Sequence, residues 1–430
     1  MKNTETSLDI LVSGAGIAGP ALAYWLRRKG FRPVVVERAP APRPGGQTVD
    51  LRGAGRTVIE RMGLLERVRE LAVDQRGIAL VDRRGRHTAR LPTELFGGEG
   101  IVSDLEILRG DLADLLYEAT ADEVEYLFDD TLTALHQDAD GVHAVFENAP
   151  PRRFDLVVGA DGLHSTTRRL AFGPERDFVT PLDCHTAWFT ARTALDLDGW
   201  FLMYNAPGGL VVSARPGRLP GEVKAAFAFR SGPLTHDRRD RAAQQRLLTE
   251  RFAGRGWESD RLLAAMAEAD DFHLDSMGQV RLDSHSRGRV ALIGDAACCP
   301  TPLTGLGTSL ALVGAYLLAH ELAAAGGDHT TAYAAYQRQM RPYAAKAQQL
   351  PPGGVAGYAP TSAAVIRLRA ASMRWMTRRP LRRLMEAQAA KASEVALPAY
   401  DAAPAPVPAP GPRTDADTGT GTGTAPVSVG

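Results

Sequence analysis

The sequence predicts an α/β fold in which a parallel sheet flanked by helices carries an inserted antiparallel sheet and is followed by a C-terminal helix. Three observations support this prediction. A strand–helix–strand pattern occupies residues 8–38, apolar strands ending in Gly/Asp turns recur at 154–162 and 288–295, and short strands separated by turns fill 184–230. Strands that alternate with helices form parallel sheets, whereas closely spaced short strands form antiparallel sheets.

The first strand–helix–strand unit carries a glycine-rich turn. Gly14 permits a tight turn, Gly16 lets the backbone approach a pyrophosphate, and Gly19 lets the helix pack closely on the strand. The following helix presents amide groups and a positive dipole end to phosphates. Glu37, at the end of the second strand, can accept hydrogen bonds from a ribose diol. The spacing therefore indicates a Rossmann-like dinucleotide-binding unit rather than a purely structural glycine turn.

Composition excludes several classes of protein. The chain has 430 residues, with 50 Lys and Arg against 50 Asp and Glu, so no net field attracts nucleic acid or an acidic membrane. Residues 1–7 are polar, so we expect no signal peptide. Polar residues interrupt the apolar stretch 306–322, so it is expected to be a buried helix and not a membrane span. The three cysteines (Cys184, Cys298 and Cys299) have neither disulfide nor metal spacing. We expect a cytoplasmic protein without a metal.

The remaining elements follow from periodicity and turn residues. Apolar residues at helical spacing predict a helix within 54–73, and Asp111 is a plausible N-cap of a helix within 105–116. Ala296 to Gly307 is expected to be a loop. The other predictions are a short strand at 49–53, a hairpin at 77–81 and 87–91, strands at 124–128, 131–137, 142–147, 184–192, 200–205, 209–215 and 223–230, and helices at 240–255, 259–269, 308–325, 330–349 and 362–395.

Three strand ends carry the residues suited to one extended cofactor. The first is the glycine loop with Glu37. The second is Asp161-Gly162, followed by Ser165 and Arg168. The third is Gly294-Asp295, followed by a Pro/Gly loop that leads into a helix. Each alone is only a strand-to-turn signal. In this order, however, they are expected to converge on one ligand.

These motifs, together with Val49-Asp50-Leu51-Arg52-Gly53, Ile107 to Leu112 and Thr308 to Leu312, resemble a known family. The chain is similar to class A flavoprotein monooxygenases of the para-hydroxybenzoate hydroxylase fold from Leu8 to about Tyr343. Within that family it resembles actinobacterial hydroxylases that tailor aromatic polyketides and the tetracycline-inactivating monooxygenases.

The resemblance implies FAD as cofactor, NADPH or NADH as reductant, and dioxygen as co-substrate. In such enzymes a flavin C4a-hydroperoxide transfers oxygen to an electron-rich carbon. Pro302, Gly305 and Gly307 would form the loop beside the flavin peroxide, and no general base is assigned. The residues implied in cofactor binding are Gly14, Ala15, Gly16, Ile17, Ala18, Gly19, Glu37, Arg38, Arg52, Arg109, Asp161, Gly162, Gly294, Asp295, Pro302, Gly305, Leu306, Gly307 and Thr308.

The substrate would lie on one face of the antiparallel sheet. Met203, Phe227 and Phe229 are candidates for an apolar lining, and Arg192 or Arg215 for orienting groups. The alternative, which we favour, is that the aromatic residues belong to the core. Cys298 stands where many relatives have His, and we expect a small packed side chain there. A multi-ring phenolic natural product is the expected substrate, and the protein would be a monomer or a homodimer.

The resemblance also divides the chain. An FAD-binding domain is expected in three segments, at 1–75, 104–177 and 281–350. A substrate domain is expected at 178–280, and the hairpin at 76–103 contributes to it. A C-terminal bracing helix is expected at 361–397 and a disordered tail at 402–430.

Other functions stay open. Baeyer–Villiger oxygenation, tetracycline-like antibiotic inactivation and non-catalytic FAD binding would use the same cofactor motifs. An NAD(P)-dependent dehydrogenase would use only the first unit, and would leave Asp161-Gly162 and Gly294-Asp295 unexplained. A visible absorbance spectrum separates flavin from nicotinamide.

Overall fold

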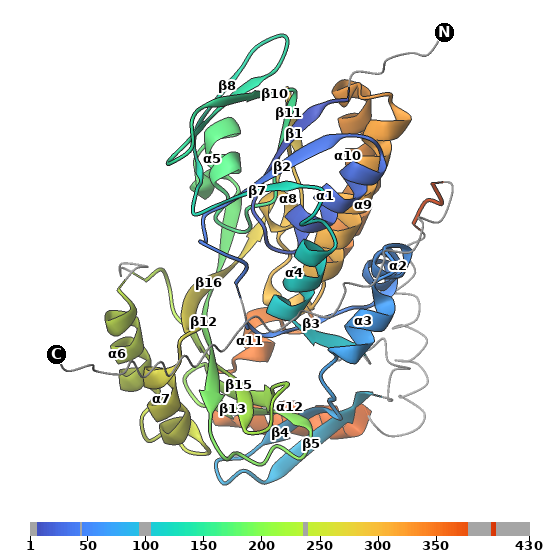
Figure 1. Ribbon diagram of the computed structural model, residues 1–430. Helices are drawn as coiled ribbons and strands as arrows, with labels where there is room; N and C mark the ends of the chain where they lie inside the picture. Colours follow the sequence, from blue (N-terminus) through green and yellow to red (C-terminus); the bar gives the residue numbers. More distant parts are fainter. Residues whose placement is uncertain (1–6, 44, 94–104, 235–239, 377–396, 401–430) are drawn as a thin grey trace, which may run out of the picture.

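The computed structural model describes residues 7–43, 45–93, 105–234, 240–376 and 397–400. It confirms the predicted α/β fold: a parallel sheet with its helices lies on one side of the molecule and a larger, mostly antiparallel sheet on the other (Figure 1). The predicted tail at 402–430 and the second half of the predicted C-terminal helix lie outside the described residues. The domain limits given above stay predictions.

The first sheet has six strands, and all but its edge strand β17 run parallel. Apolar runs form its centre because both faces are covered by other elements. From β1 the chain goes to β2 on one side and later to β11 on the other, so the strand order reverses at β1, where ligands bind in such sheets. The order is β17 (Ser286–Arg287), β18 (Val290–Leu292), β11 (Leu156–Gly159), β1 (Asp9–Ser13), β2 (Arg32–Glu37) and β7 (Glu125–Phe128).

The second sheet has seven strands. It contains the predicted hairpin, which joins through a parallel pairing of β4 with β13, so the sheet is mixed and not wholly antiparallel. It also contains β16, which the sequence did not predict. The order is β16 (His273–Val280), β12 (Val179–Arg192), β15 (Glu222–Arg230), β14 (Leu210–Pro216), β13 (Trp200–Ala206), β4 (Gly77–Val81) and β5 (His87–Pro92).

Two small sheets complete the strands. In the sequence, each strand of the two-stranded sheet lies between a strand of the first main sheet and a strand of the second. This small sheet positions residues of the candidate site. The strands are β8 (Leu132–Gln137), β9 (Val142–Phe146) and β10 (Arg152–Phe154) in one, and β3 (Thr48–Asp50) and β6 (Glu106–Leu108) in the other.

Helices bury both main sheets. In the parallel half, α1, α9 and α10 pack together in one apolar cluster (Figure 1). The helices are α1 (Ala18–Arg28), α2 (Gly53–Arg61), α3 (Leu65–Glu70), α4 (Arg109–Glu118), α5 (Thr166–Ala171), α6 (Arg241–Phe252), α7 (Ser259–Glu268), α8 (Asp295–Cys298), α9 (Gly307–Ala324), α10 (His329–Ala347), α11 (Gly354–Tyr358) and α12 (Ala363–Met376), with short 3-10 turns η2 (Glu175–Asp177) and η3 (Pro302–Thr304).

Three local predictions were wrong. The helix expected at 54–73 is two helices, because Gly63 takes a positive φ of 75° between α2 and α3. Leu108, and not Asp111, is the N-cap of α4; the Asp111 carboxylate lies 3.5 Å from Arg218 instead. The expected loop after Gly294 contains α8 and η3.

Helix α9 is long and apolar enough to cross a membrane by length and composition, but 72% of it is buried inside the protein. It packs against α1, α2 and α10. This packing is what a core helix of a globular protein shows, and it agrees with the sequence-based expectation of a buried helix.

Candidate functional site

The glycine loop between β1 and α1 has the geometry of a close-packed turn. Gly14 has a φ of +108°, and a Cβ there would lie 2.6 Å from the carbonyl oxygen of Ala160. A Cβ on Gly19 would lie 1.8 Å from the carbonyl oxygen of Gly14. Neither position can hold a larger residue, because the obstructing atoms are backbone. At Gly16 the nearest atom to a Cβ is Nη2 of Arg109, at 3.4 Å.

Glu37 holds this loop in place. Its carboxylate accepts hydrogen bonds from the amides of Ala15 (2.8 Å) and Ala39 (3.0 Å), and Arg43 lies 2.9 Å from it. Burial favours the neutral acid, but the two amides and the Arg43 charge outweigh it, so the pKa of Glu37 is lowered. Because a carboxylate has about four lone-pair sites, a ribose hydroxyl can still bind there. Arg38 is exposed beside it.

The second strand end is organised by the Asp161 carboxylate. It accepts hydrogen bonds from the amide and hydroxyl of Thr167, at 2.8 and 2.9 Å, and from the hydroxyl of Ser165. It thereby ties the turn to the start of α5. Gly162 next to it has a φ of +81°, and no described atom would contact a Cβ there within 4 Å. This turn is therefore open toward a ligand.

The third strand end meets the other two. A Cβ on Gly294 would lie 3.2 Å from Cβ of Ala18, in the first turn of α1, and 3.5 Å from Cβ of Ala311 in α9. Asp295 follows, and a Cβ on Gly307 would be 3.7 Å from its Oδ1. Burial raises the pKa of Asp295, and the thiol of Cys299 and the charge of Arg109 partly oppose that shift.

The amino ends of α1 and α9 both lie at this junction. Among the described residues, no side chain caps either helix and no acidic residue occupies either first turn. Their first amides are therefore available to an anion, and both helices are long enough to carry a dipole. Arg109 has an exposed side chain, yet surrounding protein lowers its pKa through desolvation.

A charged cluster borders the η3 loop. Nη2 of Arg52 lies 2.6 Å from Oδ2 of Asp50, and a Cβ on Gly305 would be 2.9 Å from both atoms. Glu106, on the strand paired with Asp50, lies 3.1 Å from Nη1 of Arg215 in β14. These contacts join the small β3–β6 sheet, the η3 loop and the seven-stranded sheet. The predicted residues Arg52 and Arg215 are thus brought together, whereas Asp50 and Glu106 were not predicted as site residues.

The seven-stranded sheet has a different helix layer on each face. Phe227 and Phe229 are fully buried in the cluster beneath α6 and α7, so the structure corrects their assignment as a substrate lining: alternate residues of β15 point to that core. Met203 belongs to the opposite face, with α12. Arg192 is exposed at the end of β12, opposite Glu222 in register.

Sequence reasoning also missed Arg369 and Tyr358 on this second face. Nη1 of Arg369 in α12 donates hydrogen bonds to Oδ1 of Asn205 (2.7 Å) and to the Tyr358 carbonyl (3.2 Å), and its Nη2 lies 3.8 Å from the Met203 sulfur. The guanidinium of Arg215 covers the ring of Phe201 at 3.9 Å. The basic composition of 367–379 was the available signal, but it could not single out one arginine that turns inward.

The two adjacent cysteines are buried. Burial, with the Asp295 charge, raises the pKa of Cys298 to about 12 and that of Cys299 well above its usual value. Thiols of this kind are protonated and inert at neutral pH. This supports a packing role for Cys298.

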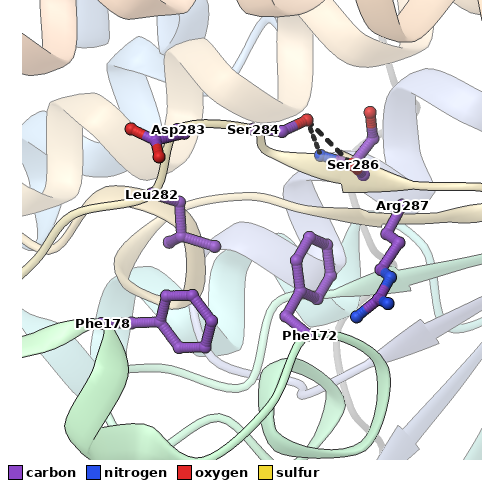
Figure 2. A pocket seen from close by; sticks show the side chains of 7 residues that line it. All are labelled: Phe172, Phe178, Leu282, Asp283, Ser284, Ser286 and Arg287. Carbon is purple, nitrogen blue, oxygen red and sulfur yellow. Dashed lines mark hydrogen bonds between the residues drawn. The ribbon is translucent and has the colours of Figure 1, made fainter.

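A pocket elsewhere on the surface is separate from these strand ends. Figure 2 shows Phe172, Phe178 and Leu282 converging in it, with Arg287 at its edge. Arg287 donates to the carbonyl of Ala171 at 3.2 Å. None of the residues predicted to bind a cofactor lines this pocket, so it does not belong to the candidate site.

Comparison with known proteins agrees with this geometry. Residues 7–350 match the model of the FAD binding domain family. The chain is 47% identical to an uncharacterised protein of Mycobacterium tuberculosis over 82% of this chain and 94% of that protein. It is 38% identical to a flavin-dependent monooxygenase of Legionella longbeachae, over 78% of this chain and 86% of that enzyme. The crystal structure of tetracycline destructase Tet(55) matches with a TM-score of 0.75 and 35% identity, covering 92% of this chain and all of that one. The resemblance seen in the sequence is confirmed, and the chain belongs to the FAD binding domain family as a flavin-dependent monooxygenase.

Proposed function

We propose that this enzyme hydroxylates a multi-ring phenolic natural product, with NADPH or NADH as reductant and dioxygen as co-substrate. The observation that carries the proposal is the junction at Gly294, where three strand ends and two uncapped helix starts meet. We also infer that it works in the cytoplasm, where the nicotinamide reductant is produced.

The residues at the junction fit FAD. The close backbone approach at Gly14 and Gly19, with the uncapped start of α1, suits the pyrophosphate, and Glu37 suits the ribose. Arg109 would lie against the cofactor from the α4 side, and Asp295 would bind its ribityl or phosphate part. Bound FAD supplies the electron storage and the activation of dioxygen.

The protein's own task is to position the substrate and to keep water away. The η3 loop, from Pro302 to Gly307, leads into the amino end of α9 and would offer backbone amides to developing negative charge. Asp161-Gly162 would contact the flavin and the nicotinamide. Closing the site around the reacting atoms strengthens these interactions, because the local dielectric falls.

The substrate would rest on the face of the seven-stranded sheet that α12 covers. Phe201, Met203 and Tyr358 supply an apolar wall, while Arg215 and Arg369 supply positive charge. Such a wall suits flat rings, and the two cations suit an acidic phenol or enol. Within the described residues no carboxylate lies in ion-pair distance of Arg369, so a substrate anion would compensate a buried charge.

Inactivation of a tetracycline-like antibiotic is a second candidate. It is favoured by the 35% identity to a tetracycline destructase across nearly the whole chain. Tetracyclines are themselves multi-ring and enolic, so the same wall and cations would serve. Baeyer–Villiger insertion of oxygen would use the same cofactor, and the product structure separates it from hydroxylation.

The test is NAD(P)H oxidation by the FAD-loaded enzyme with a panel of compounds. We expect stimulation by hydroxyanthraquinones and other multi-ring phenols, with a product heavier by one oxygen atom. Stimulation by tetracycline alone would favour the second candidate. Stimulation only by small benzoates, or oxidation of NAD(P)H without an oxygenated product, would contradict the proposal.

A further inference from the structure

The two carboxyl groups of Asp50 and Glu106 stand directly opposite each other. They are register partners in the antiparallel β3–β6 pair, where side chains on one face lie close together and like charges repel. A hydrogen bond joins the two side chains. When two carboxyl groups share a site, repulsion between their charges favours a state in which one of them keeps its proton.

Charged and polar groups contact both members of the pair. Arg52 lies 2.6 Å from Asp50, and Arg215 lies 3.1 Å from Glu106. Nε2 of Gln75 is 3.3 Å from Glu106 Oε1, and Arg215 also donates to the Thr48 hydroxyl. With one shared proton the four charged residues carry a net charge of about +1, and without it they are neutral.

The members of the pair differ in access. The Glu106 side chain is 3% exposed and that of Asp50 is 17% exposed. Asp50 also faces the η3 loop, since a Cβ on Gly305 would lie 2.9 Å from its Oδ2. Asp50 can therefore meet a ligand, while Glu106 can act only through Asp50.

We propose that Asp50 is the base that takes the hydroxyl proton of the substrate, and that Glu106, opposite it in the β3–β6 pair, is the positioning residue that shares this proton. This inference rests on the proposed function. The substrate O–H bond breaks, its proton passes to the Asp50–Glu106 pair, and the electron pair stays on the substrate oxygen as a phenolate or enolate. No electrons are exchanged in this step. The cluster gains a positive charge at the moment when the substrate becomes an anion, so each stabilises the other.

The pKa of Glu106 agrees with this role. Burial raises the pKa of Glu106 to about 7; the charge and hydrogen bond of Asp50 add to the rise, and Arg215 and Thr48 oppose it. A base with a pKa near the working pH combines availability with driving force.

The first test is the pH profile of kcat/KM with a hydroxyanthraquinone as substrate. The wild type should lose about tenfold per pH unit below about pH 7, as the pair takes its proton from solvent. Glu106→Gln removes the like charge, so its acid limb should move down by more than one pH unit. Asp50→Asn should lower kcat/KM by about 100-fold or more at all pH values. Glu125→Gln, which removes an exposed carboxylate of β7 paired with Arg152, should leave the profile unchanged.

The second test uses the wild type alone, so it needs no substrate and does not depend on whether a variant folds. Infrared spectra of the FAD-loaded wild type should contain a protonated carboxyl band that disappears between about pH 6 and 8. Absence of this band would show that Asp50 and Glu106 share no proton. A pH profile of Glu106→Gln that matches the wild type would show that Glu106 has no role in the proton transfer. If no phenol yields an oxygenated product, the proposed function fails, whereas the infrared titration still decides whether the pair exists.

Discussion

The guanidinium of Arg168 donates a hydrogen bond of 3.0 Å to the carbonyl of Ala296, and so joins the second and third strand ends of the cofactor junction. Arg168 is fully buried and also donates to the carbonyl of Leu163. Arg168→Met should leave both carbonyls without a partner and lower the free energy of unfolding by about 3 kcal/mol. Urea unfolding measures this, with Arg169→Met, an exposed neighbour on α5, as the control. Equal loss in both variants would contradict the account.

Gly19→Ala should abolish FAD binding, because the new methyl group would lie 1.8 Å from the carbonyl oxygen of Gly14 and must push the loop away. Fluorescence titration with FAD measures the affinity. Gly232→Ala, at a position where no described atom lies within 4 Å of a Cβ, should bind FAD like the wild type. An alanine at position 19 that leaves the FAD affinity intact would show that the pyrophosphate binds elsewhere.

His164 predicts how stability depends on pH. Burial would lower its pKa, but hydrogen bonds of 3.0 Å to both Asp275 and Glu175 raise the pKa to about 9. A raised folded-state pKa gives stability that is complete below the unfolded value of about 6.5 and is lost as the pH rises through about 9.

The loss should therefore be about 2–3 kcal/mol between pH 6 and 10. Unfolding free energies across this range measure it. His164→Gln should flatten the dependence, whereas His143→Gln, at an exposed position of β9, should keep it. A wild type whose stability does not fall toward pH 10 would show that His164 is not held in the charged form.

Substitutions on the two faces of the seven-stranded sheet should differ in their effects on stability and on KM. Phe227→Ala should lower the free energy of unfolding by about 3–5 kcal/mol and leave KM unchanged, because the ring lies in the core beneath α6 and α7. Met203→Leu should cost less than about 1.5 kcal/mol but change KM for a phenolic substrate. The opposite pattern would mean that the substrate binds under α6 and α7.

The sequence predicted the elements that carry local signals. Strand β1, helix α1 and Glu37 follow from the glycine spacing and the apolar period. The three strand ends lie together because β18, β11 and β1 are neighbouring parallel strands, which bring their carboxyl ends to one edge; their convergence on one cofactor stays a prediction. Strand β16 was missed, because its polar residues His273, Asp275 and Ser276 obscure the alternation of apolar and polar residues that is typical of a strand. Its pairing with β12 is a tertiary contact that this pattern does not indicate.

Contacts between distant segments could not be predicted in this way. Asp50 faces Glu106 only because β3 and β6 pair in one register across a long connection, and a one-residue slip would separate them. Phe227 and Met203 are both apolar residues of strands, and only the helices packed on each face decide which is core and which can meet a ligand. The register of strand pairing and the placement of helices depend on tertiary packing, which cannot be deduced from a single sequence.

The origin of the oxygen atom in the product tests most directly whether the enzyme is a hydroxylase of multi-ring phenols. FAD-loaded enzyme is incubated with NAD(P)H and a multi-ring phenol under heavy dioxygen, and the product is analysed by mass spectrometry. We expect a product that gains one oxygen atom carrying the heavy label, with one NAD(P)H consumed for each product molecule. A product whose added oxygen comes from water, or a protein that takes up no FAD, would contradict this expectation.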